Sequence, residues 1–175
     1  MDEEIRRVSN EPVIRAATLA DAEAIADIYN HYVTTTIVTF EEEPVSAFEI
    51  ARRMEEAWSH TLPWLVAELD GQVVGYAYAS KWKARYGYRY STEVSVYLDT
   101  EHGGRGIGSK LYGELFPILR ERGIRNIIGG IALPNDASVA LHEKFGMKKV
   151  AHFPAIGIKF DRWIDVGYWQ LGPAT

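Results

Sequence analysis

The stretch that decides the fold is Glu101-His102-Gly103-Gly104-Arg105-Gly106-Ile107-Gly108, which stands between two segments of different periodicity. Before it, residues 93–98 alternate between polar and apolar side chains, as strands do. After it, apolar residues recur at helical spacing. Glycines let a backbone approach a ligand closely, and the unpaired amides at the positive end of a helix attract anions. We therefore expect a loop that binds a diphosphate, with Arg105 adding a charge-assisted contact.

Three ligand-binding motifs compete for this loop, and a glycine-rich turn without a ligand is the fourth possibility. Gly103 and Gly108 have the spacing of a Walker loop, but Ser109-Lys110 reverses the Lys-Ser order that such a loop requires. Gly104, Gly106 and Gly108 do not have the G-x-G-x-x-G spacing of dinucleotide-binding sites. The third motif, Q/R-x-x-G-x-G/A, is matched by Gly106 and Gly108. In this respect the loop resembles the acetyl-CoA loop of the GNAT acetyltransferases.

Outward from the loop, the hydrophobic pattern predicts a strand, two helices, three strands, a helix, a strand, a helix and two strands. Asp70-Gly71 favours a type I′ hairpin turn, because both central residues of that turn need positive φ. Pro117 predicts a kink or an early end of the helix after the loop, and Gly123 predicts its end. The two closing strands are expected to turn near Asp161-Arg162. This order of elements implies an α/β fold with a mixed sheet.

Composition places the chain among globular proteins, with 175 residues, of which 47% are hydrophobic and 25% charged. We expect a polar N-terminal tail over residues 1–12 and a single domain over residues 13–175. The net charge of −5 argues against binding to duplex nucleic acid, and no apolar run is long enough to span a membrane.

Cysteine is absent, which excludes disulfides, thiolate metal sites and an acyl-cysteine intermediate. A reducing cytoplasm is therefore the expected location. The histidines are not at the spacing of metal ligands on a helix, so we expect no metal site.

Further segments resemble the same family. Residues 93–98, the loop through Ser109, and the run Leu133-Pro134-Asn135-Asp136-Ala137-Ser138 are similar to the GNAT acetyltransferases. A narrower resemblance, to the phosphinothricin N-acetyltransferases and the similar methionine sulfoximine and sulfone acetyltransferases, is found in residues 63–68, 82–85, 141–143 and 165–171. It extends over nearly all of the chain after Pro12. The resemblance implies the GNAT fold, with about four helices and a mostly antiparallel central sheet of about seven strands that splays apart at the cofactor site.

The resemblance also implies a function, namely direct transfer of an acetyl group from acetyl-CoA to the α-amine of a small amino-acid-like substrate, by a homodimer. Substrates of the phosphinothricin, methionine sulfoximine or methionine sulfone type are implied. Two positions depart from the family. Gly103 stands where Gln or Arg is usual, which removes a side-chain contact but keeps the backbone amide. His142 stands where many members have tyrosine, as in the phosphinothricin branch.

Cofactor contacts are expected from the loop and from two neighbouring segments. Backbone amides from Val96 to Leu98 should hold the thioester carbonyl and the pantetheine arm. Asn135 should bond to that arm, although Asn135-Asp136 is also a good helix N-cap. The expected cofactor contacts are Val96, Tyr97, Leu98, Gly103, Gly104, Arg105, Gly106, Ile107, Gly108, Ser109, Asn135 and Lys144.

Three side chains are candidates for proton transfer. The ammonium of the acceptor must lose a proton, and Glu93 is the candidate base because it shares a strand face with Ser95 and Tyr97. An ordinary exposed or paired carboxylate is the alternative interpretation of Glu93. His142 and Tyr97 can each protonate the departing thiolate. His142 can instead act as the base, through water, or serve only in packing.

Four further residues resemble the family's acceptor site. Lys83, Arg85 and Tyr88 follow a strand, and Arg85 can hold a carboxylate with two parallel hydrogen bonds. A solvated basic loop is the alternative for this stretch. Phe40 resembles an aromatic wall of the acceptor pocket, which Glu93 is also expected to face. Two other functions stay open: acetylation of another primary amine, such as a polyamine, an antibiotic or a peptide N-terminus, and a non-catalytic acetyl-CoA sensor.

Overall fold

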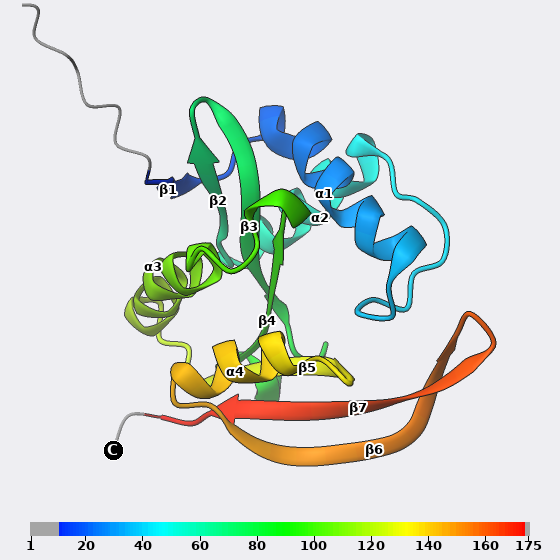
Figure 1. Cartoon of the computed structure of the whole chain (residues 1–175). Helices are drawn as coiled ribbons and strands as arrows, with labels where there is room; N and C mark the ends of the chain where they lie inside the picture. The colour runs from blue at the N-terminus through cyan, green and yellow to red at the C-terminus, as the bar shows by residue number, and fades with distance from the viewer. Residues whose placement is uncertain (1–10, 174–175) are drawn as a thin grey trace, which may run out of the picture.

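The computed structural model describes residues 11–173, which form a seven-stranded sheet covered by helices (Figure 1). The order of helices and strands is the one expected from the sequence. All but the last two residues of the predicted tail, residues 1–12, lie outside the described residues. The elements are β1 (Val13–Ala16), α1 (Ala22–Thr35), α2 (Ala47–Ser59), β2 (Trp64–Leu69), β3 (Gln72–Lys81), β4 (Ser91–Leu98), α3 (Ile107–Glu121), β5 (Asn126–Leu133), α4 (Asp136–Lys144), β6 (Lys148–Lys159) and β7 (Arg162–Leu171).

The sheet is antiparallel except at its centre. Its strand order is β1-β2-β3-β4-β5-β7-β6, and only β4 and β5 run parallel. Their pairing covers three positions, from Ser91↔Asn126 to Glu93↔Ile128. Both strands continue, to Leu98 and Leu133, without pairing to each other beyond this point. The sheet is therefore mostly antiparallel and splayed at its centre, as the sequence led us to expect.

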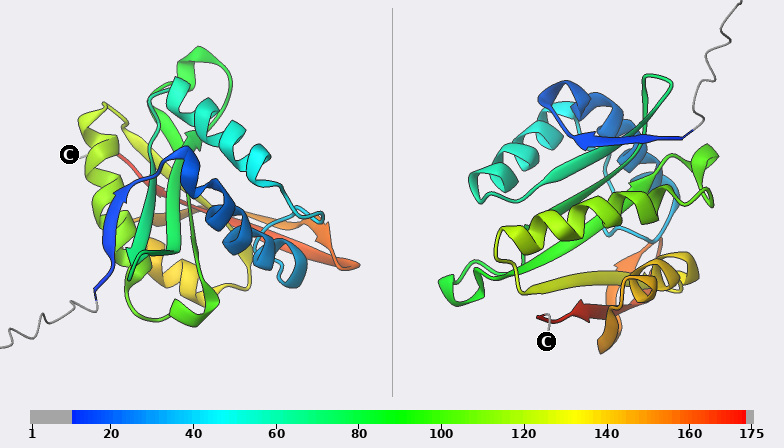
Figure 2. Two further views of the ribbon diagram at one scale, coloured as in Figure 1. Left: turned by 90° about the horizontal axis from the view of Figure 1, so that it is seen from above. Right: turned by 90° about the vertical axis from the view of Figure 1, so that its left-hand side faces the viewer.

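The core lies on both faces of the strands that precede the splay. Helix α3 packs against β2, β3 and β4 on one face, and α1 and α2 cover the other (Figure 2). The apolar stripe predicted for α3 is its buried side, where Leu111, Leu115 and Leu119 are fully inaccessible to solvent. Burying one such side chain contributes about 1.5–3 kcal/mol. This packing fixes α3, and with it the glycine loop, relative to β4.

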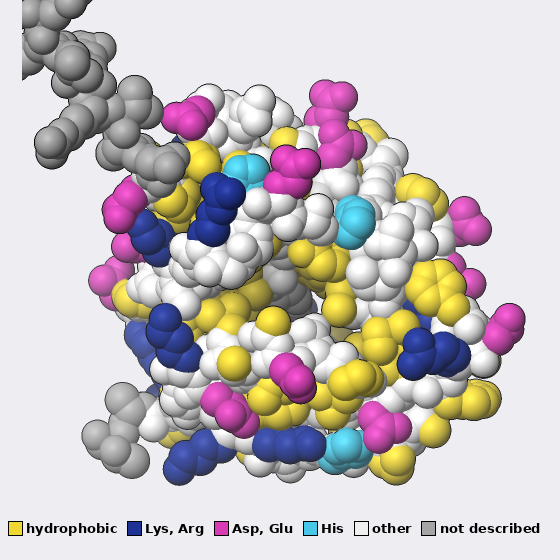
Figure 3. All heavy atoms as spheres, viewed as in Figure 1, with side chains coloured by type: hydrophobic (Ala, Val, Ile, Leu, Met, Phe, Trp, Pro, Cys, Tyr) yellow, Lys and Arg dark blue, Asp and Glu magenta, His cyan; other side chains and the backbone are white. Residues whose placement is uncertain are grey.

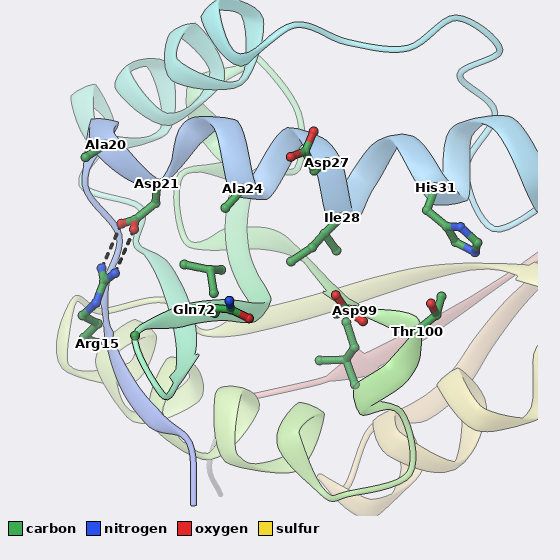
Figure 4. A pocket seen from close by; sticks show the side chains of 13 residues that line it. Arg15, Ala20, Asp21, Ala24, Asp27, Ile28, His31, Gln72, Asp99 and Thr100 are labelled. Carbon is green, nitrogen blue, oxygen red and sulfur yellow. Dashed lines mark hydrogen bonds and ion pairs between the residues drawn. The ribbon is translucent and has the colours of Figure 1, made fainter.

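An ion pair ties β1 to Asp21, the residue just before α1. The guanidinium of Arg15, in β1, donates to both carboxylate oxygens of Asp21 at 2.8 Å (Figure 4). The backbone N–H of Thr18 donates to Asp21 as well, at 2.8 Å. The Arg15 hydrogen bond is the largest cause of the lowered pKa of Asp21.

Turn and breaker residues agree with the sequence in part. Asp70 and Gly71 both have positive φ, 51° and 80°, as the predicted hairpin turn requires. The closing turn is displaced by one residue from the expected Asp161-Arg162, because Phe160 and Asp161 take the positive φ values and Arg162 already belongs to β7.

The helix after the glycine loop continues past its proline. An early end of α3 at Pro117 is wrong, since the helix runs on to Glu121. Phe116 and Leu119 on either side are buried, so tertiary packing offsets the hydrogen bond that proline cannot make. Gly123 follows the helix with φ 81°, as predicted. None of the helices described in residues 11–173 combines the length and apolar character needed to cross a membrane.

Candidate active site

A first cavity of about 430 Å³, here called the splay cavity, opens where β4 and β5 part. Figure 3 shows the hollow between the upper and lower halves of the molecule. Its walls come from β4, the glycine loop, β5 and α4. The residues predicted for cofactor contact that line it are Val96, Tyr97, Leu98, Gly103, Gly104, Gly108 and Asn135. The structure thus brings the three separate segments of the expected cofactor site to one cavity.

The glycine loop has the backbone geometry that its sequence suggests. Gly104 and Gly106 have φ of 74° and 76°, a left-handed conformation that strongly favours glycine, and Gly106 is the N-cap of α3. At Gly108 a Cβ would lie 3.1 Å from Cδ2 of Leu141, so glycine lets α3 approach α4 closely. Gly103 has φ −62°, so its backbone does not require glycine.

Five of the twelve predicted cofactor contacts do not line the cavity, namely Arg105, Gly106, Ile107, Ser109 and Lys144. The Ile107 side chain is 1% exposed in the core, which leaves only its backbone for a ligand. Lys144, at the end of α4, donates to Oγ of Ser109 at 2.9 Å and so places a positive charge beside the start of α3. Asn135 caps α4 by accepting from Ser138 N at 3.1 Å, and it lines the splay cavity at the same time.

A second cavity of about 680 Å³, here called the front cavity, adjoins the first. It lies between the segment after α1, the polar face of β4, and β5 to β7. Glu93, Tyr97 and Phe40 line it together, which brings three predicted site residues to one place. The residues that line both cavities are Val38, Ser95, Tyr97, Gly130 and Ala132.

Glu93 lies on the wall of the front cavity, at the last paired position of β4 and β5. Burial raises the pKa of its carboxyl, and the positive charge of Lys83 opposes that rise. Gly130 makes room for it, because a Cβ there would lie 3.0 Å from Oε1 of Glu93 and from Cε1 of Tyr168. A carboxylate with a raised pKa is a stronger base than an exposed one.

His142 is 3% exposed and has both ring nitrogens engaged. Its Nδ1 lies 2.7 Å from the carbonyl oxygen of Ser138, which can only accept, so Nδ1 carries the proton. Its Nε2 lies 3.2 Å from the hydroxyl of Tyr112 and accepts from it. Burial lowers the pKa of His142, so the imidazole is neutral at pH 7.

Tyr112 is a residue of this site that the sequence analysis missed. It is fully buried on α3, lines the splay cavity and bonds to His142. The sequence offered one signal, since Tyr112 follows Leu111 at the edge of the buried stripe, where a hydroxyl needs a partner.

The predicted acceptor residues are divided between two places. Phe40 lines the front cavity, and Lys83 is close enough for its charge to lower the pKa of Glu93. Arg85 and Tyr88, with Lys83, line a different cavity of about 480 Å³ that also contains Arg89 and Arg122. Within one chain, therefore, the structure does not bring Arg85 and Tyr88 to Glu93.

Another hollow, between β1, α1 and the turn after β4, has little to do with this site (Figure 4). Leu98 is its only predicted site residue, and its walls include the Arg15–Asp21 pair. Within residues 11–173 no group of three or more His, Asp or Glu side chains is arranged to hold a metal ion.

Gly129 supplies a test of the His142 arrangement. A Cβ on Gly129 would lie 2.5 Å from both Cδ2 and Nε2 of His142, so Gly129→Ala should displace the imidazole and weaken its bond to Tyr112. We expect the His142 pKa, measured by NMR titration and assigned by the signal lost in His142→Asn, to rise toward 6.5. Gly113→Ala, on an open surface of α3, is the matched control. An unchanged pKa in Gly129→Ala would contradict the assigned packing.

Comparison with known proteins agrees with this geometry. The family model described as an acetyltransferase (GNAT) domain matches residues 14–167. The chain is 43% identical to a phosphinothricin N-acetyltransferase of Streptomyces viridochromogenes, over 90% of this chain and 85% of that protein. It is 37% identical to an L-methionine sulfoximine/L-methionine sulfone acetyltransferase of Salmonella typhimurium, over 90% and 92%.

Solved structures show the same likeness. A phosphinothricin acetyltransferase from Sinorhizobium meliloti in complex with acetyl-CoA superposes with a TM-score of 0.90 at 35% identity, covering 94% of this chain and 89% of that one. The splayed strands, the glycine loop at the start of α3 and the match over residues 14–167 lead to one conclusion. The chain belongs to the GNAT family and is an acetyl-CoA-dependent N-acetyltransferase.

Proposed function

We propose that this enzyme acetylates the α-amine of a small amino-acid-like acceptor that binds in the front cavity, with Glu93 taking the ammonium proton. The observation that carries the proposal is the junction of the two cavities at Ser95 and Tyr97, with Glu93 on the acceptor side only. The relatives named for phosphinothricin and for methionine sulfoximine and sulfone support an acceptor of this size and kind.

The splay cavity fits acetyl-CoA, which supplies an acetyl group activated as a thioester. The β5-facing edge of β4 beyond Glu93 has no strand partner, so its backbone groups are free to bond to an extended amide-bearing arm. Gly103 and Gly104 line the cavity beside the N-terminus of α3, where backbone amides favour a pyrophosphate. Lys144 and Arg105 add positive charge at that end.

Glu93 is suited to the base role by position and by environment. Burial raises the pKa of its carboxyl and so increases its affinity for a proton, and the positive charge of Lys83 opposes that rise. Lys83 can also attract the acceptor's carboxylate, so a single lysine would serve both the base and the substrate.

The proton on the donor side is better assigned to Tyr97 than to His142. Neutral His142 donates its only ring proton to Ser138 and accepts from Tyr112, so it has no proton free for the cavity. Tyr97 lines both cavities, and burial raises its pKa well above 10.0, so its hydroxyl stays protonated. In this proposal His142 and Tyr112 hold the wall of the splay cavity in place.

We also propose that the enzyme is a homodimer that associates through the exposed apolar side chains of the β6–β7 hairpin, whose strand β6 is an edge of the sheet. An edge strand with large exposed apolar side chains is a surface for association. These side chains are Val150, Phe153, Ile156, Ile158, Phe160 and Trp163. Light scattering should give twice the chain mass of 19.7 kDa, and Trp163→Asp should shift it toward the monomer. A monomer for the unmodified protein would contradict this assignment.

The proposed location is the cytoplasm. Acetyl-CoA is a metabolite of the cell interior, and a chain without cysteine needs no oxidising compartment. Recovery of the native protein mainly from a membrane or extracellular fraction would argue against it.

The acceptor class is tested by CoA release from acetyl-CoA with a panel of amines. We expect activity with methionine sulfoximine, methionine sulfone or phosphinothricin, and little with polyamines, because Lys83 repels a second positive charge near Glu93. Activity confined to polyamines would support the alternative primary amine. Binding of acetyl-CoA without CoA release on any amine would support the sensor instead.

Glu93→Gln tests the proton acceptor. We expect kcat to fall by about 100-fold or more, as for loss of a general base, while the Kd for acetyl-CoA changes less than about twofold. Because burial raises the pKa of Glu93, kcat should decline as the pH falls through a value above 4.5, and that limb should vanish in the variant. Glu114→Gln, an exposed carboxyl on α3, is the control. An unchanged kcat in Glu93→Gln removes Glu93 from the mechanism.

A further inference from the structure

The segment between α1 and α2, residues 36–46, forms one wall of the front cavity although it has no helix or strand. Its contributors are Val38, Thr39 and Phe40, and Val38 also lines the splay cavity. Figures 1 and 2 show this segment passing beside the β6–β7 hairpin, which is far away in the sequence. Because this segment has no regular backbone hydrogen bonds, its position depends on contacts with neighbouring elements.

Lys159, at the end of β6, makes one of these contacts through its side chain. Its side chain is 0% exposed, and its ammonium donates to the carbonyl oxygen of Thr39 at 2.7 Å, with Tyr32 O at 3.5 Å. Within the described residues it makes no ion pair at 4.0 Å or less. The Phe160 ring lies 5.1 Å from its Nζ, and the charges of Glu41 and Glu42 also favour the ammonium. A buried ammonium without an ion pair is costly compared with an apolar side chain of the same volume, so a role in stability alone accounts poorly for it.

Gly157, two residues earlier on β6, makes a second contact, through its backbone. A Cβ there would lie 2.5 Å from Cζ of Phe40 and closer still to Cε1, so the ring rests directly on the strand backbone. The β6–β7 register shifts between Phe153 and Gly157, which marks a β-bulge. The bulge bends β6 so that the backbone at Gly157 lines the front cavity. Asp165 holds the bulge by accepting from the N–H of Ala155 at 2.8 Å.

We propose that Lys159 and Gly157 are positioning residues that fix Val38, Thr39 and Phe40 as the acceptor wall, and so set which amino-acid side chains the front cavity admits. This inference rests on the proposed function. Lys159 holds the backbone of the wall and Gly157 seats its aromatic ring. Neither lines the splay cavity itself, and of the three wall residues only Val38 does, so both should affect the acceptor side more than the donor side.

The first test is Lys159→Met, which keeps the length of the side chain but removes its donors. With the best acceptor from the amine panel, we expect KM for the acceptor to rise roughly tenfold, since small misplacements of positioning groups have large effects. KM for acetyl-CoA should stay within about twofold. Lys148→Met, an exposed position on the same strand, is the matched control and should change neither. Equal changes in both KM values would indicate general damage and overturn the proposal.

Gly157→Ala gives a second test that does not depend on burying or removing a charge. Phe40 is 39% exposed, so its ring can move aside and the variant should fold. The acceptor KM should rise about tenfold in the variant but not in Gly157→Ala made on a Phe40→Ala background, because the clash is then gone. Gly113→Ala is again the control.

The outcomes separate this inference from the proposed function. If the unmodified enzyme acetylates no amino-acid-like acceptor, the proposed function fails. If it does, and Gly157→Ala and Lys159→Met leave the acceptor KM and the ranking of acceptors unchanged, the role of β6 is overturned. An effect of Gly157→Ala that persists equally without the Phe40 ring also overturns it.

Discussion

The pairing between β4 and β5 ends after three residue pairs, and the rest of the site follows from that interruption. Two neighbouring parallel strands that stop bonding leave backbone N–H and C=O groups without partners, which is costly unless a ligand or water meets them. The gap is maintained because each strand is fixed elsewhere: β4 pairs along its length with β3, and β5 with β7. The opening is therefore a property of the sheet and does not rely on any single side chain.

The same interruption explains why β5 carries two adjacent glycines. Gly129 faces the ring of His142, and Gly130 faces Glu93 and Tyr168, so each side of the strand makes room for a different part of the site. Any side chain at either position would fill the space that the splay creates. The glycines are thus close-approach positions, and neither needs a positive φ.

How much could be predicted from the sequence depended on whether a feature was local. The hairpin at Asp70-Gly71 and the loop at Gly106 both need residues that tolerate positive φ, and both were predicted from the sequence. Alternation along β4 correctly placed Glu93 and Tyr97 on one face toward one cavity. The early helix end that Pro117 suggested, one of two alternatives with a kink, is wrong because the packing of the neighbouring helix residues outweighs the local cost of the proline.

Features that depend on distant segments were not predictable in this way. Lys159 is one lysine in a strand pattern, and nothing in its neighbours shows that Thr39, distant in the chain, supplies its acceptor. The role of Tyr112 depends on its hydrogen bond to His142, which is in contact only because α4 packs beside α3. Arg85 and Tyr88 were assigned to the acceptor site because their stretch resembles that of the family, yet the chain turns at residues 86–88 and both residues line another cavity.

The two sides of the site differ in what they are built from, and this bears on how acceptors are chosen. In the proposed function, the donor side relies largely on main-chain groups of β4 and the glycine loop, which tolerate substitution as long as the backbone path is kept. The proposed acceptor side relies on side chains from many separate elements, among them the segment after α1, β4, the bulged β6 and β7. Substitutions there can alter the shape of the front cavity without disturbing the splay, so acceptor choice can change while donor binding is retained. A donor side built from main-chain groups and an acceptor wall built from side chains are therefore both consequences of one sheet whose central pair stops early.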